Sequence, residues 1–294
     1  MSRAFSRDYS ERMPIPEDFD TNEFIRRVLA EDLGTGGDVT SNATIAADAR
    51  FTAEMNCRQA IVLAGLDLTA AFFRALDPEI EIEQLAKDGD RLGHGAVLMR
   101  LAGNARAMLT AERSALNTLQ HLSGIATLTR QYVDAIDGTG TILLDTRKTL
   151  PGLRVLEKYA ARMGGAENHR MRLDDGVLIK DNHVAVCGGV AEAVRRAKAA
   201  NTGLQVQVEV DRIDQIEPAL EAGADRLLLD NMNPAILREA VKLVGGRVPL
   251  EASGGVTLET IRFLAETGVN YISVGRITQS APAVDIGLDY SISR

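Results

Sequence analysis

The side chains best suited to bind an anion are concentrated between residues 142 and 183. Five cations and one histidine of this stretch form the candidate cluster: Arg147, Lys148, Arg170, Arg172, Lys180 and His169. The whole chain carries a formal net charge of -8, so the cluster stands in an acidic protein. Because binding of a polyanion depends on the net field of a protein, a local cluster predicts a pocket for a small anionic substrate.

Two short apolar runs, residues 142–144 and 177–179, position this cluster, and cations follow each of them. Runs this short are typical of buried strands rather than helices. The apolar spacing of residues 153–163 predicts a helix between them, which Gly164 and Gly165 end. Two buried strands joined by a helix predict a parallel unit, and α/β sheets bind ligands at the carboxyl edge of such strands.

The second half of the chain repeats this pattern. We predict further strands at 206–210, 226–229, 248–252 and 271–274, separated by helices at 190–200, 213–222, 234–244 and 257–267. Polar or glycine residues stand at the ends of successive strands, and this series is typical of a β/α barrel, here with fewer than eight clear strands. The residues of the series are Arg147 with Lys148, Lys180, Glu209, Asp230, Ser253 and Gly275.

The first half has a different texture. Strands predicted at 51–57, 60–64, 80–85 and 96–101, with a helix at 66–76, indicate an antiparallel α/β layer. One or two long helices are predicted over 105–136, and we interpret His121 as a residue that packs between helices. His94 is interpreted as a loop residue. The glycine-rich residues 34–37 follow a helix and are expected to precede none, so we predict a structural turn rather than a phosphate loop.

The bulk composition excludes several classes of protein. The 294 residues allow one large domain or two ordinary ones, and 45% hydrophobic with 25% charged residues is ordinary for a soluble globular protein. Acidic balance argues against nucleic-acid binding, and no apolar run is long enough for a membrane span. The spacing of Cys57 and Cys187 favours reduced thiols in a cytoplasmic protein. The N-terminal residues lack the apolar segment of a secretory signal.

Two late loops favour phosphate binding. Ser253, Gly254 and Gly255 pass from a strand to a helix and leave backbone N–H groups uncovered, and residues 274–276 end the next strand. Glu209 and Asp230 are an acid/base pair, metal ligands or salt-bridge partners, and Mg²⁺ brought in with a phosphate substrate suits them better than zinc. No nucleophile motif is present, so we expect the substrate itself to attack.

Six short motifs occur along the second half of the chain: 145–149 (DTRKT), 168–170 (NHR), 179–183 (IKDNH), 209–211 (EVD), 229–232 (LDNM) and 252–255 (ASGG). The set in this order is highly specific, although each motif alone is weak. Together they resemble the quinolinate phosphoribosyltransferases, also called carboxylating nicotinate-nucleotide pyrophosphorylases. The resemblance runs from Glu31 to Asp289.

The resemblance implies transfer of phosphoribosyl from phosphoribosyl pyrophosphate to quinolinate with loss of the 2-carboxylate. The products are nicotinate mononucleotide, pyrophosphate and CO₂, in de novo NAD biosynthesis. It implies a type II phosphoribosyltransferase-like fold, in which an N-terminal α/β sandwich domain accompanies an incomplete β/α barrel. It also implies a requirement for Mg²⁺, held mainly by the substrate pyrophosphate with Glu209 and Asp230 as further ligands, and a homodimer or hexamer in which Arg113 completes the site of the other subunit.

The resemblance also assigns roles to single residues. Lys148, Glu209 and Asp230 match catalytic positions. The quinolinate pocket is matched by Arg113, Thr146, Arg147, His169, Arg170 and Lys180. The phosphoribosyl pyrophosphate side is matched by Lys148, Lys180, Glu209, Asp230, Ser253, Gly254, Gly255, Val274, Gly275 and Arg276.

Three residues depart from the pattern of the family. Arg172 stands where many relatives have glycine, and Arg276 and Gln279 stand where relatives often have alanine and histidine. These departures leave the predicted quinolinate set intact and bear on the phosphate contacts.

The predicted organisation has four segments: a lead-in at 1–20, the sandwich domain at 21–137, the barrel at 138–284 and a tail at 285–294 that returns to the sandwich domain. Two alternatives to the enzyme were weighed. A related transferase associated with molybdenum uptake is disfavoured by the set of cations, and a non-catalytic phosphometabolite sensor would bind tightly without turnover.

Overall fold

The computed structural model describes residues 15–16 and 19–291, which fall into two compact units. Unit 1 comprises the described parts of Met1–Leu128, Val155–Gly164 and Ala281–Arg294, and unit 2 comprises Thr129–Arg154 and Gly165–Ser280. Most of the predicted lead-in at 1–20 lies outside the described residues. The predicted domain boundaries stay a prediction, because they are continuous ranges whereas the two units interleave along the chain.

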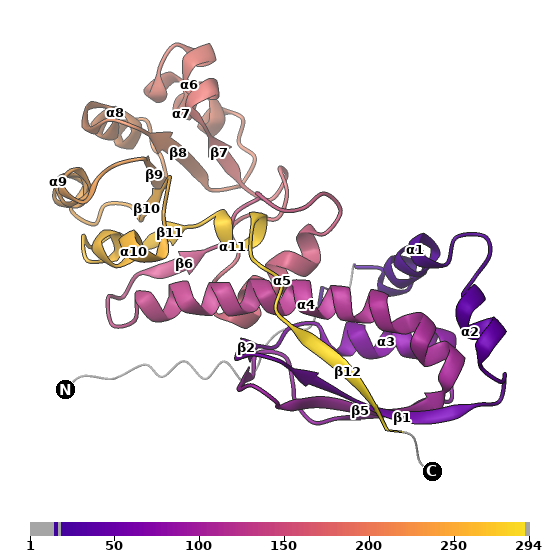
Figure 1. The fold of residues 1–294 in the computed structure, drawn as a ribbon. Coiled ribbons are helices and arrows are strands. Elements are labelled where there is room, and N and C mark those ends of the chain that lie inside the picture. Colours follow the sequence, from indigo (N-terminus) through magenta and orange to yellow (C-terminus); the bar gives the residue numbers. More distant parts are fainter. Residues whose placement is uncertain (1–14, 17–18, 292–294) are drawn as a thin grey trace. The chain divides into compact units, whose positions relative to one another are not determined.

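Unit 1 is built on a four-stranded antiparallel sheet in the order β12-β1-β5-β3 (Figure 1). Residues of β1 alternate in burial, with Ala53, Met55 and Cys57 buried, as expected for a sheet with one covered face. The antiparallel sheet predicted for the first half is confirmed. Its strands are β1 (Arg50–Cys57), β3 (Glu81–Gln84), β5 (Val97–Asn104) and β12 (Ile286–Ser291), and β2 (Ile61–Val62) pairs separately with β4 (Arg91–Leu92).

Helices α3 (Leu66–Leu76) and α4 (Ala105–Ala135) lie over this sheet in Figure 1. The region 105–135 forms one helix of 31 residues, and its last turns, from Thr129, belong to unit 2. The Asn104 side chain accepts a hydrogen bond from the Ala107 N–H at the start of α4. Helix α5 (Arg154–Gly164), predicted between two barrel strands, falls in unit 1 from Val155 onward.

The glycine-rich turn after α1 (Thr21–Leu33) corrects one prediction. A short helix, α2 (Val39–Thr44), does follow it, contrary to expectation. Its N-cap is occupied by Asp38, whose carboxylate accepts from the Ser41 N–H at 2.9 Å and from the Ser41 hydroxyl at 2.6 Å. Since the side chain of Asp38 fills the start of a six-residue helix, the turn has a structural role.

Unit 2 contains a six-stranded parallel sheet in the order β6-β11-β10-β9-β8-β7. Within the described residues β6 and β7 pair with one neighbour each, so they form the two edges and the barrel is incomplete, as predicted. Most residues of the central strands are buried, as expected for apolar strands of a parallel sheet. The strands are β6 (Ile142–Leu144), β7 (Val177–Ile179), β8 (Val206–Val210), β9 (Arg226–Asp230), β10 (Leu250–Ser253) and β11 (Tyr271–Ser273).

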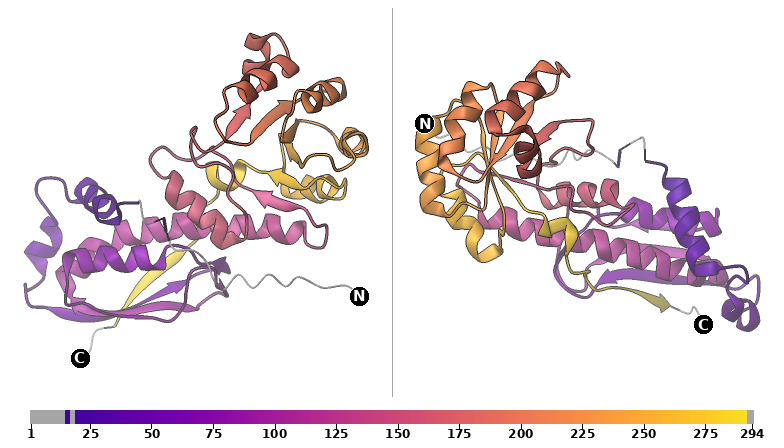
Figure 2. Two further views of the ribbon diagram at one scale, coloured as in Figure 1. Left: turned by 180° about the vertical axis from the view of Figure 1, so that it is seen from behind. Right: turned by 90° about the horizontal axis from the view of Figure 1, so that it is seen from above.

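Helices follow the strands of unit 2 and surround its sheet (Figure 2). Helix α9 shows how the sequence sets their limits: Asn233 caps its first N–H groups, Pro234 opens it, and Gly245 ends it with φ 58°. Helix α6, which directly follows β7, was not predicted. The helices are α6 (Asp181–Cys187), α7 (Val190–Ala199), η1 (Ile213–Gln215), α8 (Ile216–Glu221), α9 (Pro234–Val244), α10 (Leu258–Ala265) and α11 (Arg276–Gln279).

Two predictions about histidines of unit 1 can be checked. His94 is exposed in the turn between β4 and β5, so the loop interpretation is confirmed. His121 on α4 contacts α5, where its Nε2 lies 2.9 Å from Oε1 of the fully buried Glu157. His121 therefore packs between helices as predicted, through a polar contact rather than an apolar one.

Candidate active site

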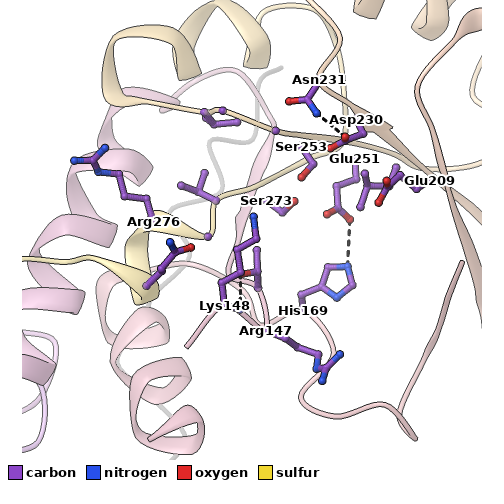
Figure 3. Close-up of a pocket in the computed structure, with 18 of the residues that line it drawn as sticks. Arg147, Lys148, His169, Glu209, Asp230, Asn231, Glu251, Ser253, Ser273 and Arg276 are labelled. Atoms are coloured by element: carbon purple, nitrogen blue, oxygen red, sulfur yellow. Dashed lines mark hydrogen bonds and ion pairs between the residues drawn. The ribbon is translucent and has the colours of Figure 1, made fainter. Parts of the chain in front are cut away.

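A cavity of about 800 Å³ lies within unit 2, at the carboxyl edge of the parallel sheet (Figure 3). All six strand-end positions predicted from the repeat line it, which confirms that the series faces one common space. Of the predicted site residues, only Arg113 does not line it. Those that do are Thr146, Arg147, Lys148, His169, Arg170, Lys180, Glu209, Asp230, Ser253, Gly254, Gly255, Val274, Gly275 and Arg276.

Arg147 and Arg170 form a cationic wall of this cavity. The Nε of each guanidinium is buried and donates no hydrogen bond within the described residues. Burial lowers the pKa of Arg170, and the nearby charge of Arg147 lowers it further. One nitrogen of Arg170 donates to the carbonyl of Gly176 at 2.9 Å, which fixes the side chain. Two neighbouring guanidiniums with unused buried donors are suited to bind a ligand with paired carboxylates.

The loop that carries His169 and Arg170 is anchored by Asp145. Asp145 is fully buried at the end of β6, and its carboxylate accepts from the His169 N–H at 2.8 Å and from the Asn168 amide. The ring of His169 is engaged at both nitrogens. Nδ1 accepts from the Arg170 N–H at 2.8 Å, and Nε2 lies 3.1 Å from Oε1 of Gln207.

The two predicted acids lie at the ends of neighbouring strands. Glu209, whose side chain is 11% exposed, is 3.3 Å from the ammonium of Lys180. Asp230 accepts a hydrogen bond of 2.6 Å from the Asn231 amide. Burial raises the pKa of Asp230, and the charges of Lys180 and Lys148 with the Asn231 hydrogen bond only partly offset this. The site thus combines cations with a carboxylate that is ion-paired, Glu209, and one whose charge is held beside an amide, Asp230.

The Ser-Gly-Gly loop after β10 passes very close to Asn231. A Cβ added at Gly254 would lie 2.1 Å from Oδ1 of Asn231, and Gly254 has φ 96°. Asn231 itself has φ 54°, and its N–H donates to the carbonyl of Ser253 at 2.9 Å. Both positions therefore adopt backbone conformations that few residues tolerate, and they lie beside Asp230.

Lys148 reaches the cavity past Gly275. A Cβ at Gly275 would lie 2.7 Å from Cδ of Lys148, so a larger residue there would displace the Lys148 side chain from this position. The hydroxyl of Thr278 donates to the Lys148 carbonyl at 2.7 Å, and the Lys148 N–H donates to Oγ1 of Thr146 at 3.0 Å. These contacts connect the loop after β6 to the loop after β11.

A buried polar cluster beneath the cavity was missed by the sequence reasoning. Glu251 on β10 is fully buried, and its Oε2 lies 2.8 Å from Nε2 of Gln207 and 2.8 Å from Nη2 of Arg226. The signal was a charged or amide residue inside each of three successive apolar strands. Other cavity residues that were not predicted are Leu178, Asp181, Leu228, Asn231, Val256, Thr257, Ser273 and Ser280.

Three remaining residues of interest have different positions. Arg113 is exposed on α4 in unit 1. Arg172 is exposed and forms an ion pair of 3.0 Å with Asp174, and it does not line the cavity. Gln279 does line the cavity, together with Arg276.

Two negative findings concern the described residues. They contain no cluster of three or more histidine, cysteine or acidic side chains arranged to hold a metal ion. None of their helices is both long and apolar enough to cross a membrane.

Comparison with known proteins gives matches along almost the whole chain. The family model of the quinolinate phosphoribosyl transferase C-terminal domain matches residues 125–289, and that of the N-terminal domain matches residues 38–123. A nicotinate-nucleotide pyrophosphorylase (carboxylating) of Mycobacterium leprae is 44% identical over 273 residues, which cover 90% of this chain and 95% of that protein. A chloroplastic protein of the same name from Arabidopsis thaliana is 39% identical, over 92% of this chain and 82% of its own length.

Solved structures agree with these sequence matches. The nicotinate-nucleotide pyrophosphorylase of Francisella tularensis superposes with a TM-score of 0.88 at 41% identity, over 92% of this chain and 96% of that chain. The protein of the same name from Ehrlichia chaffeensis gives a TM-score of 0.90 at 40% identity, over 93% and 100% of the two chains.

Proposed function

This chain belongs to the quinolinate phosphoribosyltransferase family, and we propose that it transfers phosphoribosyl from phosphoribosyl pyrophosphate to quinolinate with decarboxylation. The products are nicotinate mononucleotide, pyrophosphate and CO₂, a reaction of NAD synthesis. The observation that carries this proposal is the pair Arg147 and Arg170, whose buried Nε groups donate no hydrogen bond within the described residues, in a cavity that also holds the carboxylates of Glu209 and Asp230. That arrangement is complementary to a dianionic ring placed beside a sugar that becomes positively charged.

The quinolinate side of the cavity is the cationic wall. Arg147 and Arg170 read the two carboxylates, Lys180 adds a third cation, and Thr146 and His169 shape the wall between them. Loss of one arginine from a desolvated pair costs about 2–5 kcal/mol, because the partner charge is left unpaired. The neighbouring loops Ser253–Gly255 and Val274–Arg276 line the same cavity, and their backbone N–H groups, apart from that of Val274, which donates to the Leu144 carbonyl, are directed to the phosphoribosyl pyrophosphate in this proposal.

The first chemical step needs no protein nucleophile. The ring nitrogen of quinolinate donates its electron pair to the anomeric carbon while the bond from that carbon to pyrophosphate breaks. Positive charge develops on the ribose, and Glu209 and Asp230 stabilise it. Lys148 stabilises the negative charge of the departing pyrophosphate.

The second step uses charge created in the first. Alkylation makes the ring nitrogen a pyridinium, so the electron pair left when the 2-carboxylate departs as CO₂ is stabilised by the adjacent cation. A proton then replaces CO₂ on the ring. The protein contributes orientation, which can supply roughly 7–11 kcal/mol of the barrier in well-oriented reactions.

Mg²⁺ is the metal we propose for this reaction. The oxygen donors of Glu209 and Asp230 fit this hard cation, and the lack of a three-residue ligand cluster in the described chain fits an ion held mainly by the substrate pyrophosphate. Bound there, the ion would neutralise charge on the leaving group.

We further propose that the enzyme is a homodimer or a hexamer of such dimers, in which Arg113 enters the site of the partner subunit. Its exposure on α4 is what an arginine offered to another chain requires. We propose the cytoplasm as the compartment, a choice supported by the free state of Cys57 and Cys187.

The decisive assay follows pyrophosphate and CO₂ release with phosphoribosyl pyrophosphate and either quinolinate or nicotinate. We expect turnover with quinolinate and almost none with nicotinate, which lacks the second carboxylate. Equal rates with both acids, or binding without turnover, would remove the assignment. Arg147→Lys, which keeps the charge without the bidentate geometry, should raise the quinolinate KM by at least about tenfold.

A further inference from the structure

The fully buried Glu251 lies at the centre of a hydrogen-bonded chain that ends at the cationic wall. Its Oε2 is 2.8 Å from Nε2 of Gln207, 3.4 Å from Nε2 of His169 and 2.8 Å from Nη2 of Arg226. The guanidinium of Arg226 lies over the ring of Tyr271, 3.9 Å from its centre. Figure 3 shows Glu251 pointing toward His169 at the floor of the cavity.

A buried ion pair of this kind is weak support for stability. Taking Glu251 and Arg226 out of water costs several kcal/mol per ion, and well-packed apolar residues in their place are often neutral or stabilising. Burial alone would raise the pKa of the Glu251 carboxyl, but its hydrogen bonds and the charge of Arg226 hold it below its usual value. The fold therefore maintains a charged carboxylate directly under the site, which indicates a role in the site.

The hydrogen bonds fix the state of His169. Nδ1 accepts the Arg170 N–H, so that nitrogen carries no proton, and the neutral ring must carry its proton on Nε2. Nε2 faces the carboxamide oxygen of Gln207, whose NH₂ group faces Glu251. A carboxylate accepts hydrogen bonds only, so the charge of Glu251 determines which way the Gln207 amide is turned.

This order of contacts passes from Glu251 to the backbone of Arg170. The carboxylate orients the Gln207 amide, the amide oxygen holds the Nε2–H of His169, and Nδ1 of His169 holds the Arg170 N–H. Arg170 then presents its guanidinium beside that of Arg147. Two like charges repel, so their separation must be maintained by contacts of this kind.

We propose that Glu251 is a positioning residue for the dicarboxylate pocket, acting through Gln207 and His169 to hold Arg170 in place. The proposal deepens the proposed function, on which it rests for the identity of the ligand. Glu251 lines the floor of the cavity, and in this proposal it acts through its neighbours rather than on the reacting atoms. It orients His169 through Gln207 and so holds in place the loop that carries Arg170. Residues hydrogen-bonded to metal ligands orient those ligands in the same way.

The kinetic test compares Glu251→Gln, Gln207→Leu and the double variant. We expect each single change to raise the KM for quinolinate by about 10- to 100-fold, as misplacement of a binding group does. The KM for phosphoribosyl pyrophosphate should change less than about threefold, since Glu251 meets the loop after β11 through Ser273, and the route from Glu251 to Arg170 does not pass through that residue. If both residues act through one pathway, the double variant should be no worse than about the poorer single variant. Glu251→Asp, which retains the charge, should recover part of the loss.

Glu157→Gln is the matched control. Glu157 is also a fully buried glutamate hydrogen-bonded to a histidine, at 2.9 Å from His121, but it lies in unit 1 and does not line the cavity. We expect this variant to lower thermal stability while the KM for quinolinate stays unchanged. An equal rise in KM in Glu157→Gln and Glu251→Gln would show a general loss of folding and overturn the proposal.

A spectroscopic measurement on the ligand-free protein separates this proposal from the assignment of the reaction. The chain has four histidines, so ¹⁵N spectra of histidine-labelled protein are simple, and His169→Asn identifies the signal of His169. We expect the Nε2–H tautomer in the wild type and a shifted Nε2 signal in Gln207→Leu, because Nε2–H then loses its amide acceptor. A proton on Nδ1 in the wild type would overturn the proposal. Absence of turnover with quinolinate would contradict the proposed function, whereas the tautomer of His169 would still test the hydrogen-bonded chain from Glu251 to Arg170.

Discussion

Replacement of Gly254 by alanine tests the close approach of the Ser-Gly-Gly loop to Asn231. The new Cβ would lie 2.1 Å from Oδ1 and 2.6 Å from Cγ of Asn231, so the Asn231 side chain must leave its place. Its departure removes the 2.6 Å hydrogen bond to Asp230, a loss of about 1.5–3 kcal/mol for a charged acceptor. The positive φ of Gly254 adds about 1 kcal/mol of backbone strain.

Gly255→Ala is the matched control for this change. Gly255 has φ 59°, and a Cβ there would meet nothing within 4 Å, so it suffers the backbone strain alone. With about 1.4 kcal/mol per factor of ten, we expect kcat/KM for phosphoribosyl pyrophosphate to fall about 100-fold in Gly254→Ala and about fivefold in Gly255→Ala. Steady-state kinetics at saturating quinolinate measures both values, and thermal unfolding checks that both variants are folded.

The double variant Gly254→Ala with Asn231→Gly removes the side-chain clash. Because this variant also lacks the hydrogen bond to Asp230, we expect its kcat/KM to stay close to that of Gly254→Ala, and a recovery to the value of Gly255→Ala would show that the lost hydrogen bond is not the cause of the fall. Equal losses in Gly254→Ala and Gly255→Ala would refute the reasoning, because the two substitutions differ mainly in this contact.

Five further outcomes are expected. Arg113→Ala should abolish activity, and mixing it with Arg147→Ala should restore part of it through hybrid dimers; no restoration would count against a shared site. Burial raises the pKa of Asp230, and this carboxyl must be ionised to act, so the acidic limb of the kcat/KM profile should lie above pH ~4. In Asp230→Asn this limb should be absent, and the activity that remains should be lower. Arg226→Gln should lower the free energy of unfolding by about 3–5 kcal/mol at pH 7, since it leaves Glu251 unpaired. The pKa of Glu251 is lower in the folded than in the unfolded protein, so its ionisation contributes stability at pH values above the unfolded pKa. In the wild type this contribution should fade only as the pH falls below ~4.3, which denaturation at several pH values measures. Chelation of Mg²⁺ should abolish turnover without lowering the melting temperature, and a metal-independent rate would remove Mg²⁺ from the proposal.

The strand-end residues could be predicted because each stands where an apolar run stops. Lys180 directly follows β7, while Glu209, Asp230 and Ser253 are the last or next-to-last residues of their strands, and parallel strands bring their carboxyl ends to one edge. The repeating strand–helix pattern therefore allowed both the parallel sheet and many of the residues that line the cavity to be predicted.

The cluster around Glu251 could not be predicted in the same way. Its members come from different strands, and only the pairing register, which places Gln207 opposite Arg226, brings them together. A single polar residue within a strand does not show its partners. The placement of α5 in unit 1 is a further case, because its helical spacing defines an apolar face but not the surface that the face will cover.

The long α4 and the short α6 mark another limit. Apolar spacing over 105–135 was compatible with one helix or two. The stretch contains no proline, and its one glycine, Gly124, does not by itself force a break. At Gly124 an added Cβ would lie 2.2 Å from the Pro282 carbonyl oxygen, so that glycine serves a close approach of two segments rather than a break in the helix. Helix α6 has no buried residue, and without an apolar face it gave no periodic signal.

The position of β12 has a consequence for biosynthesis. β1 is an inner strand of its sheet, and one of its two neighbours is formed by residues 286–291. A ribosome that has completed β1 must therefore add more than two hundred residues before that neighbour exists. During this interval the nascent chain exposes an unpaired strand edge, the kind of surface at which other chains associate. Loss of the last strand through premature termination would make that exposure permanent, so such products should be cleared or should aggregate rather than persist as a smaller folded protein.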